Sequence, residues 1–199
     1  MRQSLVFVGI GALVIIIGLL LINRGFTRPP ENIDTTLQPM ATSTLTLTST
    51  AFANNTSIPS KYTCDAGNNP PSPPLSITGA PEGTKTLALI VYDPDVPKQL
   101  LPSGEFVHWV VFNIPGSVTE ITEGAQVGTT GANGAGKNVF AGPCPPPQYQ
   151  PNEHRYFFTL FALDASLSLK AGASKDEVLK AMQGHILAQT QLLGKYKKK

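Results

Sequence analysis

The sequence predicts a mainly β domain with one late α-helix, preceded by a hydrophobic N-terminal segment. Two observations indicate this fold class. Glycine and proline divide the chain into short alternating or continuous apolar runs, and one stretch near the C-terminus has apolar residues at helical spacing. The 199 residues are enough for one domain plus an extension, and 41% of them are hydrophobic, so we expect a globular domain with a filled core.

The first element is an apolar run over residues 5–22 that contains no charge. A helix of this length extends about 27 Å, which is enough to cross the hydrocarbon core of a bilayer. A cleavable signal peptide is the alternative, but it has a shorter apolar core that ends at a small-residue cleavage site. We therefore predict a transmembrane anchor over residues 1–23 and a flexible tether over residues 24–42. The domain over residues 43–199 is expected outside the cytoplasm, on a single-pass membrane protein.

Four runs in this domain predict strands, and they cover residues 44–48, 85–92, 106–114 and 155–163. The first run alternates with period 2, as in a strand with one buried face. The later three are apolar at nearly every position and rich in β-branched and aromatic residues. This pattern is typical of central strands that are covered on both faces.

A capping box predicts the start of the late helix, because Ser174 is followed three residues later by Glu177. The apolar residues Val178, Met182 and Ile186 then recur at helical spacing. We therefore predict an amphipathic helix over residues 174–188.

The charge distribution excludes a nucleic-acid-binding protein. The formal net charge of the chain is +2, but seven of its fifteen Lys and Arg residues lie near the two ends. Residues 43–194 contain 8 basic and 11 acidic residues, a net charge of −3. The basic stripe that nucleic acid requires is therefore missing from residues 43–194.

Three segments place titratable groups in or beside the predicted strands. Asp93 and Asp95 directly follow the strand over 85–92, His108 lies within an apolar strand, and a Gly-Pro-Cys-Pro loop precedes His154. An isolated histidine in such a strand is usually a packed core residue. Three such segments in one small sheet indicate a shared site. Trp109 follows His108 and is expected to point to the opposite face, into the core.

Five motifs along the domain resemble one known family. They are Ser72-Pro-Pro-Leu75, Asp93-Pro-Asp95, Phe106-Val-His108-Trp-Val-Val-Phe-Asn-Ile-Pro115, Gly142-Pro-Cys-Pro-Pro146 and His154-Arg-Tyr156. In this order they resemble the phosphatidylethanolamine-binding protein family, in its bacterial and archaeal branch, which is often called Raf-kinase-inhibitor-like. The resemblance covers about residues 43–196.

The resemblance implies an antiparallel β-sandwich-like fold with a small anion pocket at one end of a large sheet. The implied pocket residues are Asp93, Asp95, His108, Gly142 and His154, with Tyr156 nearby. Imidazole and backbone N–H groups that converge in a hollow suit a phosphate, a phosphomonoester or a phospholipid headgroup. The chain has Phe140 where relatives commonly have a tyrosine, which removes one hydroxyl from the implied donor set.

The implied function is a binding module that modulates or inhibits a protein partner such as a kinase or a protease, without a cofactor. An enzyme is the alternative, either a metal-dependent hydrolase that uses His108, His154 and an Asp or a thiol hydrolase built on Cys144. A structural domain with a vestigial pocket is a third hypothesis. The phosphate-loop-like stretch over 131–138 is rejected, because Asn138 replaces the Mg-binding hydroxyl and no helix follows.

The two cysteines, Cys64 and Cys144, do not have the spacing of a zinc site, which needs two more close ligands. In the family-like fold, both would adjoin the pocket loops. They then form either a disulfide or two unpaired buried thiols.

Overall fold

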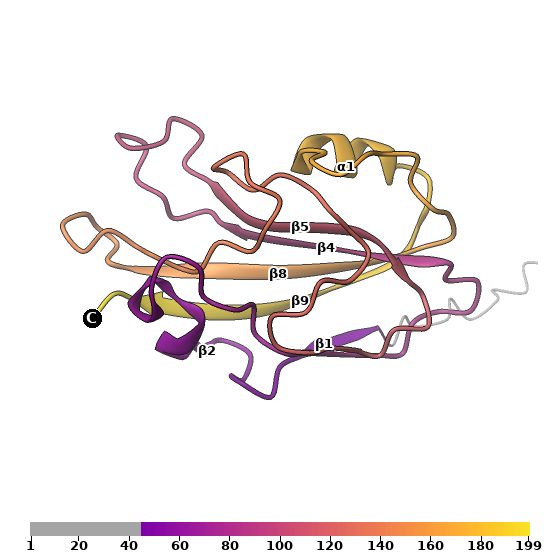
Figure 1. The fold of residues 1–199 in the computed structure, drawn as a ribbon, viewed down its shortest axis with the longest axis horizontal. Helices are drawn as coiled ribbons and strands as arrows, with labels where there is room; N and C mark the ends of the chain where they lie inside the picture. The colour runs from indigo at the N-terminus through magenta and orange to yellow at the C-terminus, as the bar shows by residue number, and fades with distance from the viewer. Residues whose placement is uncertain (1–44) are drawn as a thin grey trace, which may run out of the picture. The chain divides into compact units, whose positions relative to one another are not determined.

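The computed structural model describes residues 45–199 (Figure 1). A six-stranded sheet, here called the large sheet, has the strand order β2 (Thr56–Ser57), β9 (Ile186–Lys197), β8 (Glu153–Leu163), β4 (Thr86–Asp93), β5 (Phe106–Pro115) and β7 (Thr129–Thr130). A three-stranded sheet, the small sheet, has the order β1 (Thr46–Thr48), β3 (Leu75–Thr78) and β6 (Glu120–Ile121). Two 3-10 helices, η1 (Ser60–Tyr62) and η2 (Cys64–Ala66), and one α-helix, α1 (Lys175–Ala181), complete the elements.

The core lies on both faces of the large sheet, which explains the continuous apolar strands. Leu87, Leu89 and Val91 of β4 belong to a cluster shared with the small sheet, whereas Ala88 and Ile90 belong to a second cluster shared with α1. Figure 1 shows α1 and β1 on opposite sides of the long strands. The predicted mainly β sandwich with one helix is thus confirmed.

The helix is shorter than predicted. The capping box is present, because the Ser174 side chain accepts from the Glu177 backbone and the Glu177 side chain accepts from the Ser174 backbone. The helix ends at Ala181, and Gly184 then turns the chain with a φ of 79°. Ile186 therefore begins strand β9, which pairs with β8 along its whole length and which the sequence patterns did not predict.

The predicted fold class is corrected in one respect. Within residues 45–199, no helix is both long enough and apolar enough to cross a bilayer, and α1 has only seven residues. The transmembrane helix is therefore no part of the fold that the structure describes. The anchor predicted over residues 1–23 and the tether predicted over residues 24–42 lie outside the described residues.

A β-bulge in β5 determines where His108 points. Val91 pairs with Trp109 but Tyr92 pairs with Val107, so His108 is an extra residue in the ladder. The His108 ring lies 5.1 Å from the ring of Tyr156, which belongs to the same core cluster as Trp109. Trp109 is a core residue as predicted, but the expectation that it faces away from His108 is wrong, because the bulge breaks the alternation.

Candidate functional site

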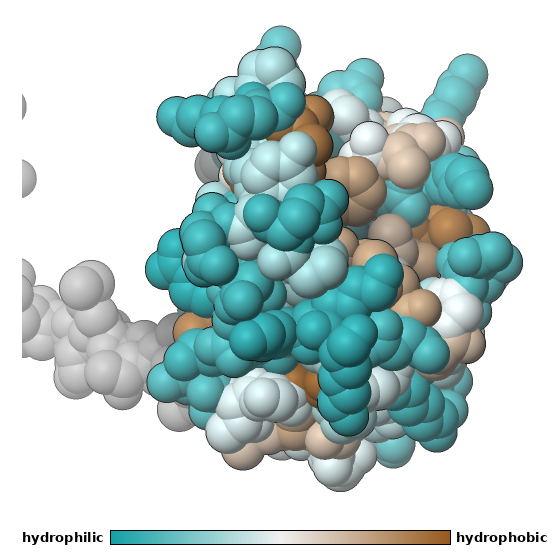
Figure 2. All heavy atoms as spheres, turned by 90° about the vertical axis from the view of Figure 1, so that its left-hand side faces the viewer, coloured by the Kyte–Doolittle hydropathy of each residue, from teal (hydrophilic) through white to brown (hydrophobic). Residues whose placement is uncertain are grey.

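Three buried titratable side chains converge at one end of the large sheet. Asp93 is the last residue of β4, whereas His108 and His154 lie near the starts of the antiparallel neighbours β5 and β8. Their exposed fractions are 3%, 5% and 0%. Figure 2 shows this end of the sheet, where apolar atoms lie between hydrophilic side chains.

Asp93 and His154 form a buried hydrogen bond, with 2.7 Å between Oδ2 of Asp93 and Nδ1 of His154. The other carboxylate oxygen of Asp93 accepts from the backbone N–H of Asp95 at 2.8 Å. Burial raises the pKa of Asp93, although its hydrogen bond with His154 opposes this shift. Nε2 of His154 is sealed from solvent and has no partner among residues 45–199. The carboxylate therefore orients the ring and leaves Nε2 as the ring nitrogen without a protein partner.

The second imidazole is also fixed through Nδ1. His108 Nδ1 lies 2.6 Å from the carbonyl oxygen of Ala141. A carbonyl only accepts, so Nδ1 carries the proton and Nε2 of the neutral ring is an acceptor. Burial lowers the pKa of His108 to about 4, so this ring is neutral at pH 7.

Around these groups lies a pocket of about 360 Å³, called here the histidine pocket. Its polar lining includes Asp93, His108 and His154, and the rest is mainly apolar. Gly142, which was predicted as a pocket residue, also lines the pocket. The other lining residues were not predicted from the sequence, and they are Val96, Leu100, Phe106, Ala141, Cys144, Pro145 and Pro146. The sequence could have indicated these residues only by their position, since each lies within a few residues of a predicted site residue.

The structure places Asp95 outside the pocket lining. Its carboxylate accepts from Nε of Arg155 at 2.9 Å and from a terminal guanidinium nitrogen of Arg155 at 2.7 Å. It also accepts from the Arg155 backbone N–H at 2.9 Å. These hydrogen bonds lower the pKa of Asp95. Asp95 therefore ties the loop after β4 to the start of β8.

Of the two remaining predicted site residues, Gly142 lines the histidine pocket, whereas Tyr156 is not among the lining residues and contacts His108. The Tyr156 ring packs edge-on against His108, and burial raises the pKa of its phenol, so that the hydroxyl stays protonated. Gly142 is needed because a Cβ there would lie 2.4 Å from Pro70 Cγ and 2.9 Å from the Tyr62 carbonyl oxygen. The pocket loop therefore packs directly on the chain around η1.

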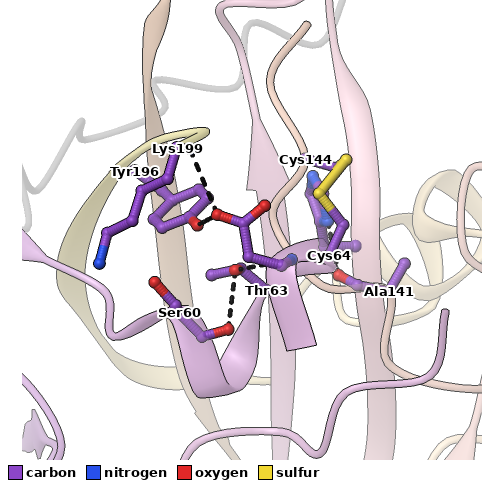
Figure 3. The surroundings of a disulfide bond; sticks show 9 residues. Ser60, Thr63, Cys64, Ala141, Cys144, Tyr196 and Lys199 are labelled. Carbon is purple, nitrogen blue, oxygen red and sulfur yellow. Dashed lines mark hydrogen bonds between the residues drawn. A yellow bond between two sulfur atoms is a disulfide. The ribbon is translucent and has the colours of Figure 1, made fainter. Parts of the chain in front are cut away.

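A disulfide joins Cys64 of η2 to Cys144 of the pocket loop (Figure 3). Beside it, the Cys64 backbone N–H donates to the Pro143 carbonyl at 3.0 Å. Cys144 is exposed and also lines the histidine pocket. Of the two arrangements that the sequence left open, the structure contains the disulfide.

The metal-dependent alternative requires at least three ligands that face one point. In the part of the chain that the structure describes, no three His, Cys, Asp or Glu side chains are grouped so that they could hold a metal ion. Nδ1 of His108 and Nδ1 of His154 are each engaged with an oxygen atom of the protein. The described residues give this alternative no geometric support.

Comparisons with known proteins agree with this architecture. A family model described as phosphatidylethanolamine-binding protein matches residues 48–197. The chain is 44% identical over 153 residues to a UPF0098 protein of Chlamydia pneumoniae, a match that covers 76% of this chain and 98% of that protein. It is 44% identical over 155 residues to a UPF0098 protein of Methanothermobacter thermautotrophicus, which covers 74% and 95%.

Two solved structures are similar over nearly their whole length. One is a putative phosphatidylethanolamine-binding protein homolog, CT736, from Chlamydia trachomatis, with a TM-score of 0.73 and 42% identity, covering 79% of this chain and 99% of that one. The other is Escherichia coli YbcL, described as a member of the mammalian family, with a TM-score of 0.68 and 28% identity, covering 78% and 99%. From the family match, the bacterial and archaeal relatives and these folds, we conclude that the chain belongs to the phosphatidylethanolamine-binding protein family.

Proposed function

We propose that the histidine pocket binds a small phosphate-bearing anion, either inorganic phosphate or a phosphomonoester such as phosphoethanolamine. Family membership supports a ligand-binding module. The observation that supports the finer proposal is the pair of imidazoles, each fixed through Nδ1, of which His154 has a sealed and unpartnered Nε2.

The two imidazoles suit complementary hydrogen bonds. In the complex, Nδ1–H of His154 donates to the Asp93 carboxylate and Nε2–H donates to a phosphate oxygen, so that the carboxylate balances the charge of the ring. His108 is neutral, so its Nε2 accepts from a P–OH group. A singly protonated phosphate supplies both an acceptor oxygen and that hydroxyl. The pocket is therefore matched to the monoanion.

Calorimetric titration of the full chain with inorganic phosphate and phosphoethanolamine, at pH 6 and pH 8, tests the proposal. We expect saturable binding that is stronger at pH 6, where more of the ligand is the monoanion. Sulfate is the matched control, because it has the same shape but no proton to donate to His108. Equal binding of sulfate at pH 6, or no binding of either phosphate compound, would overturn the proposal.

We further propose that the ligand state of this pocket controls binding of a protein partner, as the family resemblance implies. The support is Leu100, which lines the pocket and is 49% exposed. A photo-crosslinking residue at position 100 should capture the partner in cells in a phosphate-dependent manner.

We also propose that the domain lies outside the cytoplasm. The disulfide supports this location, since such bonds persist in oxidising compartments.

A further inference from the structure

A second pocket, about 370 Å³ in volume, lies beside Trp109 and is called here the Trp109 pocket. The chain segment over 138–142 lines both pockets. Asn138, Val139 and Phe140 line the Trp109 pocket, whereas Ala141 and Gly142 line the histidine pocket. The two pockets have no lining residue in common, so the Trp109 pocket is separate from the proposed phosphate site.

Two deeply buried polar side chains line the Trp109 pocket without a partner. Trp109 is 4% exposed and Ser72 is 3% exposed. Neither the indole N–H nor the serine hydroxyl has a hydrogen-bond partner among residues 45–199, yet neither atom is sealed from solvent. Both groups can therefore form hydrogen bonds with a molecule that enters the pocket.

The rim of the Trp109 pocket adds uncommitted amides and a hydroxyl. The side chains of Gln126, Asn138 and Thr130 line it, and no described residue accepts from or donates to them. A carboxamide presents a donor and an acceptor side by side, which matches a pair of neighbouring hydroxyls on a ring. Phe140 is half-buried and packs edge-on against Trp109. Its exposed part supplies an apolar surface for the C–H face of a ligand ring that carries such hydroxyls.

The lining of the Trp109 pocket contains no ionisable residue. A charged ligand would lose its hydration without gaining a counter-charge, which is costly. From the aromatic floor, the amide and hydroxyl rim and the absence of charge, we infer that the Trp109 pocket binds a neutral sugar. Pockets of this volume, with a few convergent polar groups on an apolar base, are typical of small-molecule sites.

Trp109 is the only tryptophan of the chain, so it reports on this pocket directly. The full chain, labelled with ¹⁵N, is titrated with glucose, galactose, mannose, N-acetylglucosamine and their disaccharides while the single indole N–H peak and the tryptophan emission are recorded. We expect a saturable shift of both signals with at least one sugar. A shift with none of them, or only with a capped dipeptide included as the alternative ligand, overturns the inference.

Variants then locate the site. Asn138→Ala and Gln126→Ala each remove one amide, and each should weaken sugar binding about tenfold. Gln189→Ala is the matched control, because it removes an exposed amide from β9 that does not line the Trp109 pocket. Since all three side chains lie at the surface, the melting temperatures should stay unchanged. Equal sugar affinity of the double variant and the parent chain contradicts the assignment.

Discussion

The Nδ1–H of His108 donates a 2.6 Å hydrogen bond to the carbonyl oxygen of Ala141. In return, the Ala141 N–H donates to the His108 carbonyl at 2.8 Å. The bulged start of β5 and the pocket loop are thus joined by two hydrogen bonds between the same two residues. This pairing fixes the tautomer of the buried ring and leaves Nε2 as its ligand-binding atom.

Replacing His108 with asparagine or with glutamine tests the roles of its two ring nitrogens separately. His108→Asn keeps a donor near Nδ1 for Ala141 but removes Nε2, whereas His108→Gln places an amide near Nε2 and leaves the Ala141 carbonyl without its partner. We expect His108→Asn to weaken phosphate binding about tenfold with little loss of stability. His108→Gln should retain more affinity but lower the free energy of unfolding by about 1 kcal/mol. Calorimetry and urea denaturation measure both effects, and the reverse pattern contradicts the assigned tautomer.

His108 should also make stability depend on pH. Burial lowers its pKa from 6.5 to about 4 in the folded protein, so the unfolded chain binds more protons between these values. The free energy of unfolding should therefore fall as the pH drops from 6.5 to 4, by up to about 3 kcal/mol. The raised pKa of Asp93 acts in the opposite direction, but it is common to the parent chain and His108→Asn. Urea denaturation of the parent chain and of His108→Asn at pH 7, 5.5 and 4.5 isolates the contribution of His108 to the pH dependence. If the free energy of unfolding changes equally with pH in both proteins, His108 makes no such contribution.

The Asp93–His154 pair predicts the largest loss of ligand binding. Asp93→Asn removes the negative charge that balances a protonated His154, and it should weaken phosphate binding by between tenfold and one hundredfold. Asp164→Asn is the matched control, because Asp164 contacts Nδ1 of His185 at 2.8 Å in an exposed pair away from the pocket. Calorimetry with phosphate measures both variants. Similar losses in both would mean that Asp93 has no specific role.

Local patterns predicted the long strands and the helix start but not the last strand. The apolar runs of β4, β5 and β8 are read directly from sequence, because both faces are buried along nearly all of β4, most of β5 and the end of β8. From Ala188 onward every second residue of strand β9 is more buried than its neighbours, but Ile186 and Leu187 at its start are exposed. Its inward positions include the small or polar residues Ala188, Thr190 and Gly194, so the alternation in burial is a weak hydrophobic signal in the sequence.

The site was predictable as a set of segments but not as a geometry. Three titratable residues next to strand ends indicated that Asp93, His108 and His154 would meet, and the structure brings them together. The bulge that turns His108 toward the pocket side follows from the pairing register, which single-strand patterns do not contain. Asp95 has the same local sequence context as Asp93. Only the position of Arg155 in the fold shows that Asp95 binds this arginine instead of lining the pocket.

Removal of the disulfide should affect both stability and ligand binding. Cys64 and Cys144 are separated by 80 residues, and loss of a native disulfide typically costs about 2–5 kcal/mol. A Cys64→Ser, Cys144→Ser double variant should therefore unfold at a lower urea concentration. It should also bind phosphate more weakly, because the bond holds the loop that carries the His108 partner. Complete reduction and alkylation of the parent chain should reproduce both changes, and an unchanged phosphate affinity would show that the hydrogen bonds alone hold the loop.

The clamp between Asp95 and Arg155 gives the opposite expectation for ligand binding. Asp95→Asn removes a bidentate ion pair whose arginine is half exposed, so the loss of stability should be about 1 kcal/mol or less. Because the Asp95 carboxylate points to Arg155 and does not line the histidine pocket, the phosphate affinity should stay within about twofold of the parent value. Calorimetry and urea denaturation on Asp95→Asn and Asp93→Asn in parallel distinguish the two carboxylates. A large loss of phosphate binding in Asp95→Asn would show that the loop after β4 must be held for the site to form, and Asp95 would then count as a positioning residue.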